Sequence, residues 1–210
     1  MSSTVTIDGQ ECVIVPDGPL DQDAYDKAPV KVVHILKEAT KSDGLAGKLL
    51  ENIRKDGTVK WRIWKVTARR SYALQNGLRP WDSLSPEAFG QAFRASAVLN
   101  LNDTIPCGKE DRFTSDTEGV ARFAGLRWPD TREKITQLRP SVVVCGGTYE
   151  LATRLFRDRG EAVQDQGDFF VWDGIPFIKA FHPSFWGRRH SDEYEEFRQR
   201  SLKAMPLFAR

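Results

Sequence analysis

The sequence predicts an α/β fold of the three-layer sandwich type, in which helices cover both faces of a central four-stranded parallel sheet. Four short apolar runs, three of them with two or more β-branched residues, have the composition of strands that are buried on both faces. The segments between these runs carry apolar residues at helical spacing. Because strands that alternate with helices favour parallel pairing with right-handed crossovers, we expect the four strands to form one sheet.

The four expected strands are 30–36, 95–101, 141–146 and 175–181. Apolar residues share one helix face within 45–53 and within 88–93, and 192–205 is expected to form a terminal helix. After the third strand, Gly147 is expected to supply a turn, and Thr148 is expected to cap the helix that follows.

Two hairpins and two loops complete the expected fold. A hairpin over 169–175 turns at Asp173 and Gly174 and leads into the fourth strand. The stretch VTIDGQECVIVP near the start of the chain has the pattern of a second, smaller hairpin. The segments 79–85 and 105–116 are expected to be surface loops.

Length and composition are those of one globular domain. The chain has 210 residues, of which 40% are hydrophobic and 29% are charged, and these values exclude the disordered and fibrous classes. We expect a single domain over 1–210, in which 1–29 form an N-terminal extension or hairpin. No run approaches the roughly 20 apolar residues that span a bilayer, and the start lacks the layout of a signal peptide. We therefore expect a cytoplasmic monomer without membrane contact.

Cysteine spacing and net charge restrict the kinds of site. Cys12, Cys107 and Cys145 lack the close pairs that are typical of zinc and iron–sulfur sites. We expect them to be reduced and structural, and we expect no metal or other cofactor. The net charge is only +2, but 31 basic residues against 29 acidic ones leave room for a local basic face.

Polar residues follow each expected strand, at the edge where ligands of parallel sheets bind. These residues are Lys37 and Glu38 after the first strand, Asn100 and Asn102 at the second, Gly146, Gly147 and Thr148 at the third, and His182 and Ser184 after the fourth. Asparagine offers donors and acceptors, histidine can donate to a developing oxyanion, and glutamate can orient a water molecule. This set suits the binding of a polar heterocycle. Asn102 is the alternative to Asn100, because a one-residue shift in register moves a side chain to the opposite face.

Four segments resemble the uracil-DNA glycosylase superfamily. FHPSF at 181–185 is similar to its His-Pro-Ser motif, and VVHILKEATKS at 32–42 matches in part its first-strand motif, Gly-Gln-Asp-Pro-Tyr or Gly-Glu-Ala-Pro-Gly. AVLNLND at 97–103 is similar to the strand that supplies a base-reading asparagine, and LRPSVVVCGGTYELATRLF at 138–156 looks like the third strand and its helix. The resemblance covers most of the chain from about residue 30 onward, and it implies the uracil-DNA glycosylase-like form of the predicted fold.

The resemblance also implies a reaction and three catalytic residues. The reaction is hydrolysis of the N-glycosidic bond of a damaged or deaminated, uracil-like base in DNA, with no cofactor. His182 would donate to the base oxygen, and one such donor contributes roughly 3–4 kcal/mol in the transition state. Asn100 would read the base edge, and Glu38 would position water or stabilise the cationic sugar.

The loop after His182 is the expected DNA-binding element. Phe185 or Trp186 would fill the gap that a flipped nucleotide leaves, while Arg188 and Arg189 would hold flanking phosphates. Ser184 is assigned to the same surface. For the two arginines, the alternative is pairing with nearby acidic residues, which would contribute little.

A second candidate surface combines basic and aromatic side chains. It comprises Lys65, Arg69, Arg70 and Arg79, interleaved with Trp61, Trp64, Tyr72 and Trp81. Such residues would neutralise phosphates and stack on bases. The alternative is that the aromatic side chains pack in the core or against loops.

Two positions depart from the superfamily's first-strand motif. Lys37 stands where the motif has glycine, and Thr40 stands where it usually has proline. Because a lysine side chain fills space that glycine leaves open, we assign Lys37 to base or DNA binding: it closes the pocket, contacts a phosphate or selects another base. Two other functions stay open, which are a non-catalytic protein that binds nucleic acid or a nucleotide, and a small-molecule enzyme on the same scaffold.

Overall fold

The computed structural model describes residues 4–7, 9–38, 51, 53, 59, 62–84, 86–107, 117–184, 187 and 189–209. Within these residues the chain forms a mixed α/β fold whose main sheet has the strand order β3-β5-β4-β7-β10-β9-β8. The four central strands are parallel, and they are β5 (Ser96–Asn102), β4 (Val32–Glu38), β7 (Val142–Gly146) and β10 (Ile175–Ala180). Each lies within two residues of its predicted bounds, so the four parallel strands are confirmed.

Antiparallel strands extend both sides of the parallel centre. β9 (Phe169–Trp172) pairs with β10, β8 (Gln164–Asp165) pairs with β9, and β3 (Gly18–Pro19) pairs with β5. The turn between β9 and β10 has φ of 50° at Asp173 and 76° at Gly174. Two successive residues with positive φ are typical of a type I′ turn, and the predicted hairpin is confirmed.

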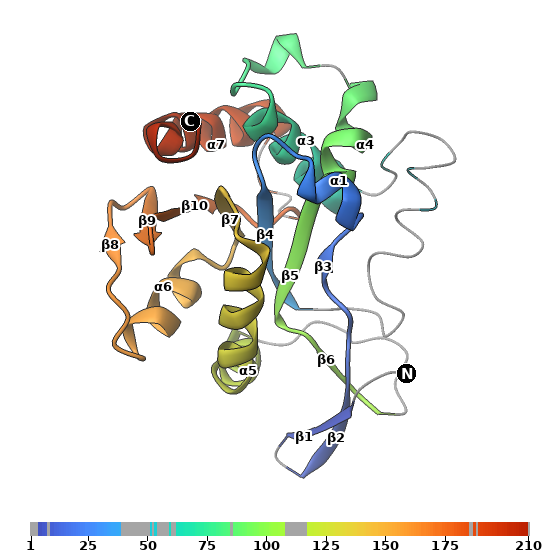
Figure 1. The fold of residues 1–210 in the computed structure, drawn as a ribbon, viewed down its shortest axis with the longest axis vertical. Coiled ribbons are helices and arrows are strands. Elements are labelled where there is room, and N and C mark those ends of the chain that lie inside the picture. Colours follow the sequence, from blue (N-terminus) through green and yellow to red (C-terminus); the bar gives the residue numbers. More distant parts are fainter. Residues whose placement is uncertain are drawn as a thin grey trace.

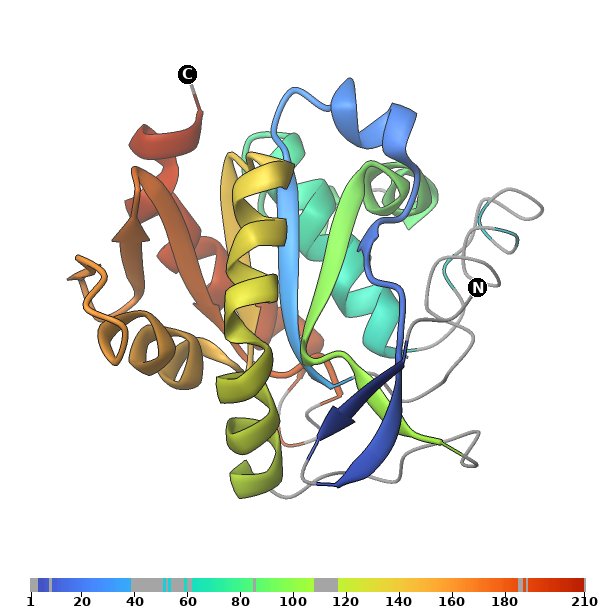
Figure 2. The same ribbon diagram turned by 60° about the horizontal axis from the view of Figure 1, so that its bottom comes forward.

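Helices cover both faces of the main sheet, as Figures 1 and 2 show. The helices α5 (Thr117–Leu138) and α6 (Tyr149–Arg157) cover one face. The opposite face carries α3 (Arg62–Gln75), α4 (Pro86–Arg94) and α7 (His190–Phe208). The short helices α1 (Gln22–Asp26) and η1 (Trp81–Ser83) lie in connecting segments, η1 within the expected loop 79–85. The segments 88–93 and 192–205, predicted to be helical, lie within α4 and α7.

Successive residues of β5 pack into opposite layers. Leu99 and Leu101 belong to the apolar cluster that contains Trp128 of α5, whereas Val98 packs in the cluster that contains Phe93 of α4. This alternation is the period of two expected of a strand buried on both faces. Each large apolar side chain that is fully buried contributes about 1.5–3 kcal/mol to folding, so the layers are held mainly by these contacts.

Two long helices, α3 and α5, have no counterpart in the sequence prediction, and neither has the short helix α1. Within α5, Pro129 lacks the amide hydrogen that would bond to the carbonyl of Gly125, four residues earlier. Arg159 supplies the missing donor, with Nη2 lying 2.6 Å from that carbonyl oxygen. The helix expected over 45–53 lies outside the described residues except for 51 and 53.

A second, three-stranded sheet lies beside the main one. β1 (Thr4–Ile7) and β2 (Gln10–Ile14) form the hairpin predicted near the start, and β6 (Thr104–Pro106) pairs with β2. The prediction of a surface loop from residue 105 is therefore wrong at its beginning, because backbone pairing with β2 draws this segment into a strand. β3 and α1 were grouped with the N-terminal extension, but β3 is an edge strand of the main sheet.

Candidate functional site

The carboxyl ends of the four parallel strands form a rim along one edge of the main sheet. The strand register pairs Glu38 at the end of β4 with Asn102 at the end of β5. It also pairs Gly146 of β7 with Ala180 of β10. This edge lies at the bottom of the sheet in Figure 2, where β5 passes into β6. Because ligands of open α/β sheets bind at such an edge, the rim is the candidate site.

The turn after β7 ties three of the strand ends together. The amide of Gly147 donates to the carbonyl of Ala180 at 2.8 Å, and Thr148 Oγ1 donates to the carbonyl of Ile35 at 2.8 Å. Thr148 occupies the predicted cap position of α6, but its hydroxyl bonds to β4 and makes no capping hydrogen bond. The prediction of a side-chain cap was therefore wrong, because the β4 carbonyl takes the hydroxyl instead. As a result β4, β7 and β10 are joined beyond their regular pairing.

Gly147 also brings the turn against His182. Its φ is 72°, a conformation that glycine adopts without steric penalty. A β-carbon placed at Gly147 would lie 2.8 Å from Cβ of His182 and 3.2 Å from its backbone nitrogen. The absence of a side chain at this position therefore allows the close approach of the two loops.

The imidazole of His182 is oriented by Ser184. The hydroxyl of Ser184 lies 2.6 Å from Nδ1, and the backbone amide of Ser184 donates to the same nitrogen at 3.3 Å. Because a backbone amide can only donate, Nδ1 is an acceptor, and the proton of the neutral ring is assigned to Nε2. In this tautomer Nε2 carries the proton of the neutral ring and is its N–H donor. Ser184, which was assigned to DNA binding, orients the ring in this structure.

A buried arginine that sequence reasoning had assigned to a DNA surface holds the residue before His182. Arg70 Nη2 donates to the carbonyl of Phe181 at 2.8 Å and also pairs with the carboxylate of Glu193. The Arg70 side chain is only 2% exposed. Burial lowers the pKa of its guanidinium, and the contact with Glu193 opposes this shift. These partners lie 111 and 123 positions away in the sequence, so no local pattern indicates the contact.

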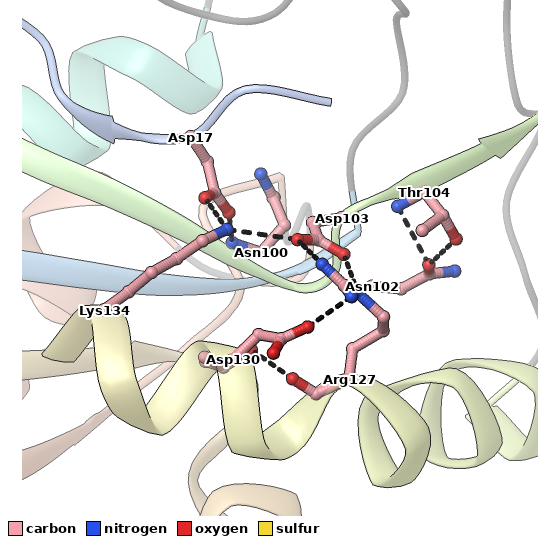
Figure 3. A network of polar contacts seen from close by, with 9 residues as sticks. Asp17, Asn100, Asn102, Asp103, Thr104, Arg127, Asp130 and Lys134 are labelled. Carbon is pink, nitrogen blue, oxygen red and sulfur yellow. Dashed lines mark hydrogen bonds and ion pairs between the residues drawn. The ribbon is translucent and has the colours of Figure 1, made fainter. Parts of the chain in front are cut away.

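The side-chain amide of Asn102 has a defined orientation. Its Oδ1 accepts from the amide of Thr104 at 3.2 Å and from the hydroxyl of Thr104 at 2.8 Å (Figure 3). The oxygen must face Thr104, since a backbone amide cannot accept. The Nδ2 group has no hydrogen-bond partner among the described residues, although Asn102 is fully buried. A buried donor left without an acceptor costs about 1–3 kcal/mol, and a bound ligand with an acceptor would satisfy it.

Asn100 lies two residues deeper along β5, opposite Leu36. It is buried, and its backbone amide donates to Asp17 Oδ2 at 2.8 Å. Asn100 and Asn102 share the sheet face of Val98, because residues two apart on a strand point the same way. The two asparagines therefore lie on the same face of the sheet and differ only in their position along β5. The expectation that a one-residue shift in register would decide between them was wrong. Asn102 is the one at the strand end.

The first strand places its two candidates differently. Glu38 ends β4, and its backbone is paired with Asn102, while its side chain lies outside the described residues. Lys37 is half-buried. Leu36 packs in the cluster of α3 and α4, so alternation puts Lys37 on the opposite sheet face, away from the face of the two asparagines.

Most of the expected DNA-binding loop lies outside the described residues. This applies to Phe185, Trp186 and Arg188, about which the structure gives no information. Arg189 is exposed and immediately precedes α7.

No protein-family model matches this chain, and no curated protein matches it significantly. Its function is therefore inferred from the chemistry of the rim.

The second candidate surface is divided by the structure: Lys65 and Arg79 are exposed, whereas the described aromatic side chains and Arg70 pack inward. Tyr72 and Arg70 are buried on α3, because that segment is a helix with one face against the core. Trp64 stacks on Phe93 at a centroid distance of 5.9 Å, and Trp81 packs against Tyr194 at 5.7 Å. The alternative of core and loop packing is correct for these three aromatic side chains, and Trp61 lies outside the described residues.

The described residues contain no group of three or more His, Cys, Asp or Glu side chains that is arranged to hold a metal ion. The three cysteines are free thiols; Cys12 and Cys145 are buried, while Cys107 is exposed. Over the described part of the chain, no helix has the length and apolar content needed to cross a membrane.

A hollow with a volume of about 720 Å³ lies between α1, β3 and the last turns of α5. Its walls include Tyr25, Lys31, Lys134 and Arg139, but not His182 or Asn102. Size alone therefore does not identify the site.

Proposed function

We propose that this chain is a DNA N-glycosylase of the uracil-DNA glycosylase superfamily, which hydrolyses the N-glycosidic bond of a damaged or deaminated, uracil-like base. The observation that carries the proposal is a pair of hydrogen-bond donors at one rim. They are Nδ2 of Asn102, at the end of β5, and Nε2 of His182, after β10. Three strand spacings separate β5 from β10, which corresponds to about 14 Å. We assign one planar base ring to the space between these two donors.

The chemistry of Asn102 favours a base that carries a carbonyl group. Both lone pairs of Oδ1 are used by Thr104, so the amide offers ligands only its two N–H donors. A carbonyl oxygen complements such a donor, whereas an exocyclic amino group faces it with a second donor. Deamination converts an amino group of a base into a carbonyl, which is why deaminated bases are the proposed substrates.

Each residue then has one role in the proposed reaction. A water oxygen bonds to C1′ of the sugar as the bond from C1′ to the base nitrogen breaks, and the electron pair leaves with the base. The Nε2 hydrogen of His182 stabilises the negative charge that develops on the base oxygen. Glu38 is the residue that we assign to the attacking water, from which it takes a proton. Asn102 reads the base, with Asn100 beneath it, and no cofactor takes part.

A non-catalytic protein that binds nucleic acid or a nucleotide is the alternative function. The observation that favours it is Lys37, a half-buried lysine where the superfamily motif has glycine. A protein with either function would bind DNA, but only the glycosylase would cleave the N-glycosidic bond. We propose DNA as the partner in both cases, bound by a monomer at the rim and by the loop that contains Arg189.

The test of the proposed function is a cleavage assay on labelled oligonucleotides. Single- and double-stranded substrates carry uracil, hypoxanthine, xanthine or a mismatched thymine, and alkali then breaks any abasic site. We expect alkali-dependent cuts with at least one base, and a loss of about 100- to 1,000-fold in His182→Ala.

Two controls make the assay decisive. Thermal unfolding of His182→Ala establishes that the variant is folded, and Gln137→Ala, an exposed position on α5, should cleave like the parent protein. Absence of cuts on every substrate, together with salt-dependent DNA binding, would replace the glycosylase by the non-catalytic alternative.

A further inference from the structure

A group of charged side chains covers the end of β5, directly beside Asn102 (Figure 3). Arg127 of α5 contacts both oxygens of Asp103, with Nε 3.1 Å from Oδ1 and Nη2 3.3 Å from Oδ2. Lys134, two turns further along α5, lies 3.1 Å from Asp103 Oδ2 and 2.6 Å from Asp17 Oδ1. Asp130 completes the group by pairing with Arg127. One helix thereby contacts two separate acidic residues near β5.

The side chain of Asp17 accepts a backbone hydrogen bond from β5 that a neighbouring strand would otherwise accept. β3 pairs with β5 at Ala97 and Val98, and beyond Val98 the described residues supply no further strand partner on that side. There Asp17 Oδ2 accepts the amide of Asn100 at 2.8 Å, a bond that the next residue of a strand would normally supply. The last part of β5 therefore depends on this carboxylate, and the carboxylate is held by Lys134.

Asp103 is held by both its backbone and its side chain. Its carbonyl accepts the amide of Val15 at 2.7 Å, while its carboxylate bonds to α5. It lies between Asn102 and Thr104, the two residues whose side chains bond to each other. Fixing residue 103 therefore fixes the backbone on which the Asn102 amide is oriented.

The burial of these charges also indicates a geometric role. The carboxylates of Asp17 and Asp103 are each only 2% exposed. Burial raises the pKa of Asp17, while Lys134 acts in the opposite direction. Moving two carboxylates out of water costs free energy of folding. Apolar side chains of similar volume at such positions often make a protein equally or more stable than the buried ion pairs do. A buried charge network is instead suited to holding a segment in one geometry, as outer-shell hydrogen bonds do around functional sites.

We propose that Arg127 and Lys134 are positioning residues, which act through Asp103 and Asp17 to hold residues 100–104 so that the Asn102 amide presents its N–H donors to the rim. The chemistry that they serve is base recognition, so the activity readout rests on the proposed function. A second readout, the side-chain amide of Asn102 in NMR spectra of the ligand-free protein, does not depend on that function.

The test compares variants of three basic residues on helix α5, which are Arg127, Arg132 and Lys134. Arg127→Gln removes the two-point contact with Asp103, and Arg127→Lys keeps the charge but loses the paired geometry. Arg132→Gln is the matched control, because Arg132 lies on the same helix and forms a 2.8 Å ion pair with Glu161, away from β5. We expect the Asn102 side-chain amide signal to shift or broaden in both Arg127 variants and in Lys134→Gln, but not in Arg132→Gln.

The activity readout is a double-variant comparison. Base excision should fall about 10- to 100-fold in Arg127→Gln, and Arg127→Gln combined with Asn102→Ala should be no slower than Asn102→Ala alone. Independent, multiplicative losses would overturn the proposal, because they indicate general damage to the fold. An unchanged Asn102 amide signal in folded Arg127→Lys would also overturn it. If the parent protein excises no base, the proposed function fails, but the NMR comparison still decides whether Arg127 and Lys134 position Asn102.

Discussion

Gly147 and His182 are packed so closely that a single added methyl group would separate them. A β-carbon at Gly147 would lie 2.8 Å from Cβ of His182, a distance at which one of the two must move. The turn after β7 and the loop after β10 are therefore positioned as a unit, and the proposed donor of the reaction depends on a residue that makes no contact with substrate through a side chain.

We predict that Gly147→Ala reduces base excision at least tenfold, because the displaced backbone moves His182. The variant also carries the cost of positive φ in a non-glycine residue, about 1–2 kcal/mol. Gly160→Ala is the matched control, since Gly160 has almost the same φ of 71° and nothing within 4 Å of the added carbon. Thermal unfolding and excision rates are measured for both variants. Equal losses of activity would show that backbone strain alone, and not contact with His182, is responsible.

The buried pair of Arg70 and Glu193 leads to a second prediction. Arg70→Met leaves the carboxylate of Glu193 without its cation, and we expect the free energy of unfolding to fall by about 3–5 kcal/mol. Adding Glu193→Met should restore most of that stability, because no uncompensated charge then remains. Excision by the double variant should stay low, since the carbonyl of Phe181 has lost its donor. Denaturant unfolding and excision rates test this, and parent-like excision by the stable double variant would exclude Arg70 from positioning His182.

The third prediction concerns the pH dependence of stability. His34 is buried with Nε2 2.8 Å from Ser71 Oγ, and burial, reinforced by Arg70, lowers its pKa from 6.5 to about 3. The unfolded chain takes up a proton on this residue below pH 6.5, whereas the folded chain does so only near pH 3. Its contribution to stability is therefore complete above pH 6.5 and is lost as the pH falls, by up to about 1.4 kcal/mol per pH unit.

Urea unfolding between pH 7.5 and 5 measures this effect. Asp17 has a raised pKa, so its contribution has the opposite sign, and the comparison with His34→Gln isolates the histidine. We expect His34→Gln to lose stability less steeply with falling pH than the parent protein. Parallel curves for the two proteins would mean that folding does not lower the pKa of His34.

The orientation of His182 gives a fourth prediction. In the neutral ring the proton should reside on Nε2, because Nδ1 accepts from the amide of Ser184. Nitrogen NMR distinguishes the two tautomers directly. Ser184→Ala keeps the backbone donor and removes the hydroxyl, so we expect the same tautomer with about tenfold slower excision as the ring becomes less restricted. If the proton of the neutral ring is found on Nδ1 in the parent protein, His182 is excluded as the proposed donor to the base.

The strands could be predicted from sequence because their signal is local. Each of β4, β5, β7 and β10 is a short, mostly buried apolar run, and the Asp173–Gly174 turn has residues suited to positive φ. The helices α3 and α5 were missed because their faces mix apolar and charged residues; in α3 even Arg70 and Ser71 are buried. Composition alone does not reveal that such polar residues face inward.

The candidate site was predictable only in part, for a related reason. His182 and Asn102 could be found because they stand at strand ends. Asp17 and Lys134, which hold β5 from outside, lie 117 positions apart in the sequence, and no spacing rule connects them. Thr148 shows the same limit, because its position predicts a cap while its hydroxyl bonds to a carbonyl 113 positions away.

The bonds that join β4, β7 and β10 at the rim also bear on the order in which the protein folds. The hydroxyl of Thr148 bonds to β4, and the amide of Gly147 bonds to β10. The rim is therefore incomplete until residues 175–180 have been synthesised and have joined the sheet. Contacts between such distant segments form late and slowly, because chain entropy must be lost before they contribute. The nascent chain therefore passes through a period in which the strands β4, β5 and β7 are present but the rim is not complete, and during that period the proposed DNA-binding surface does not yet exist.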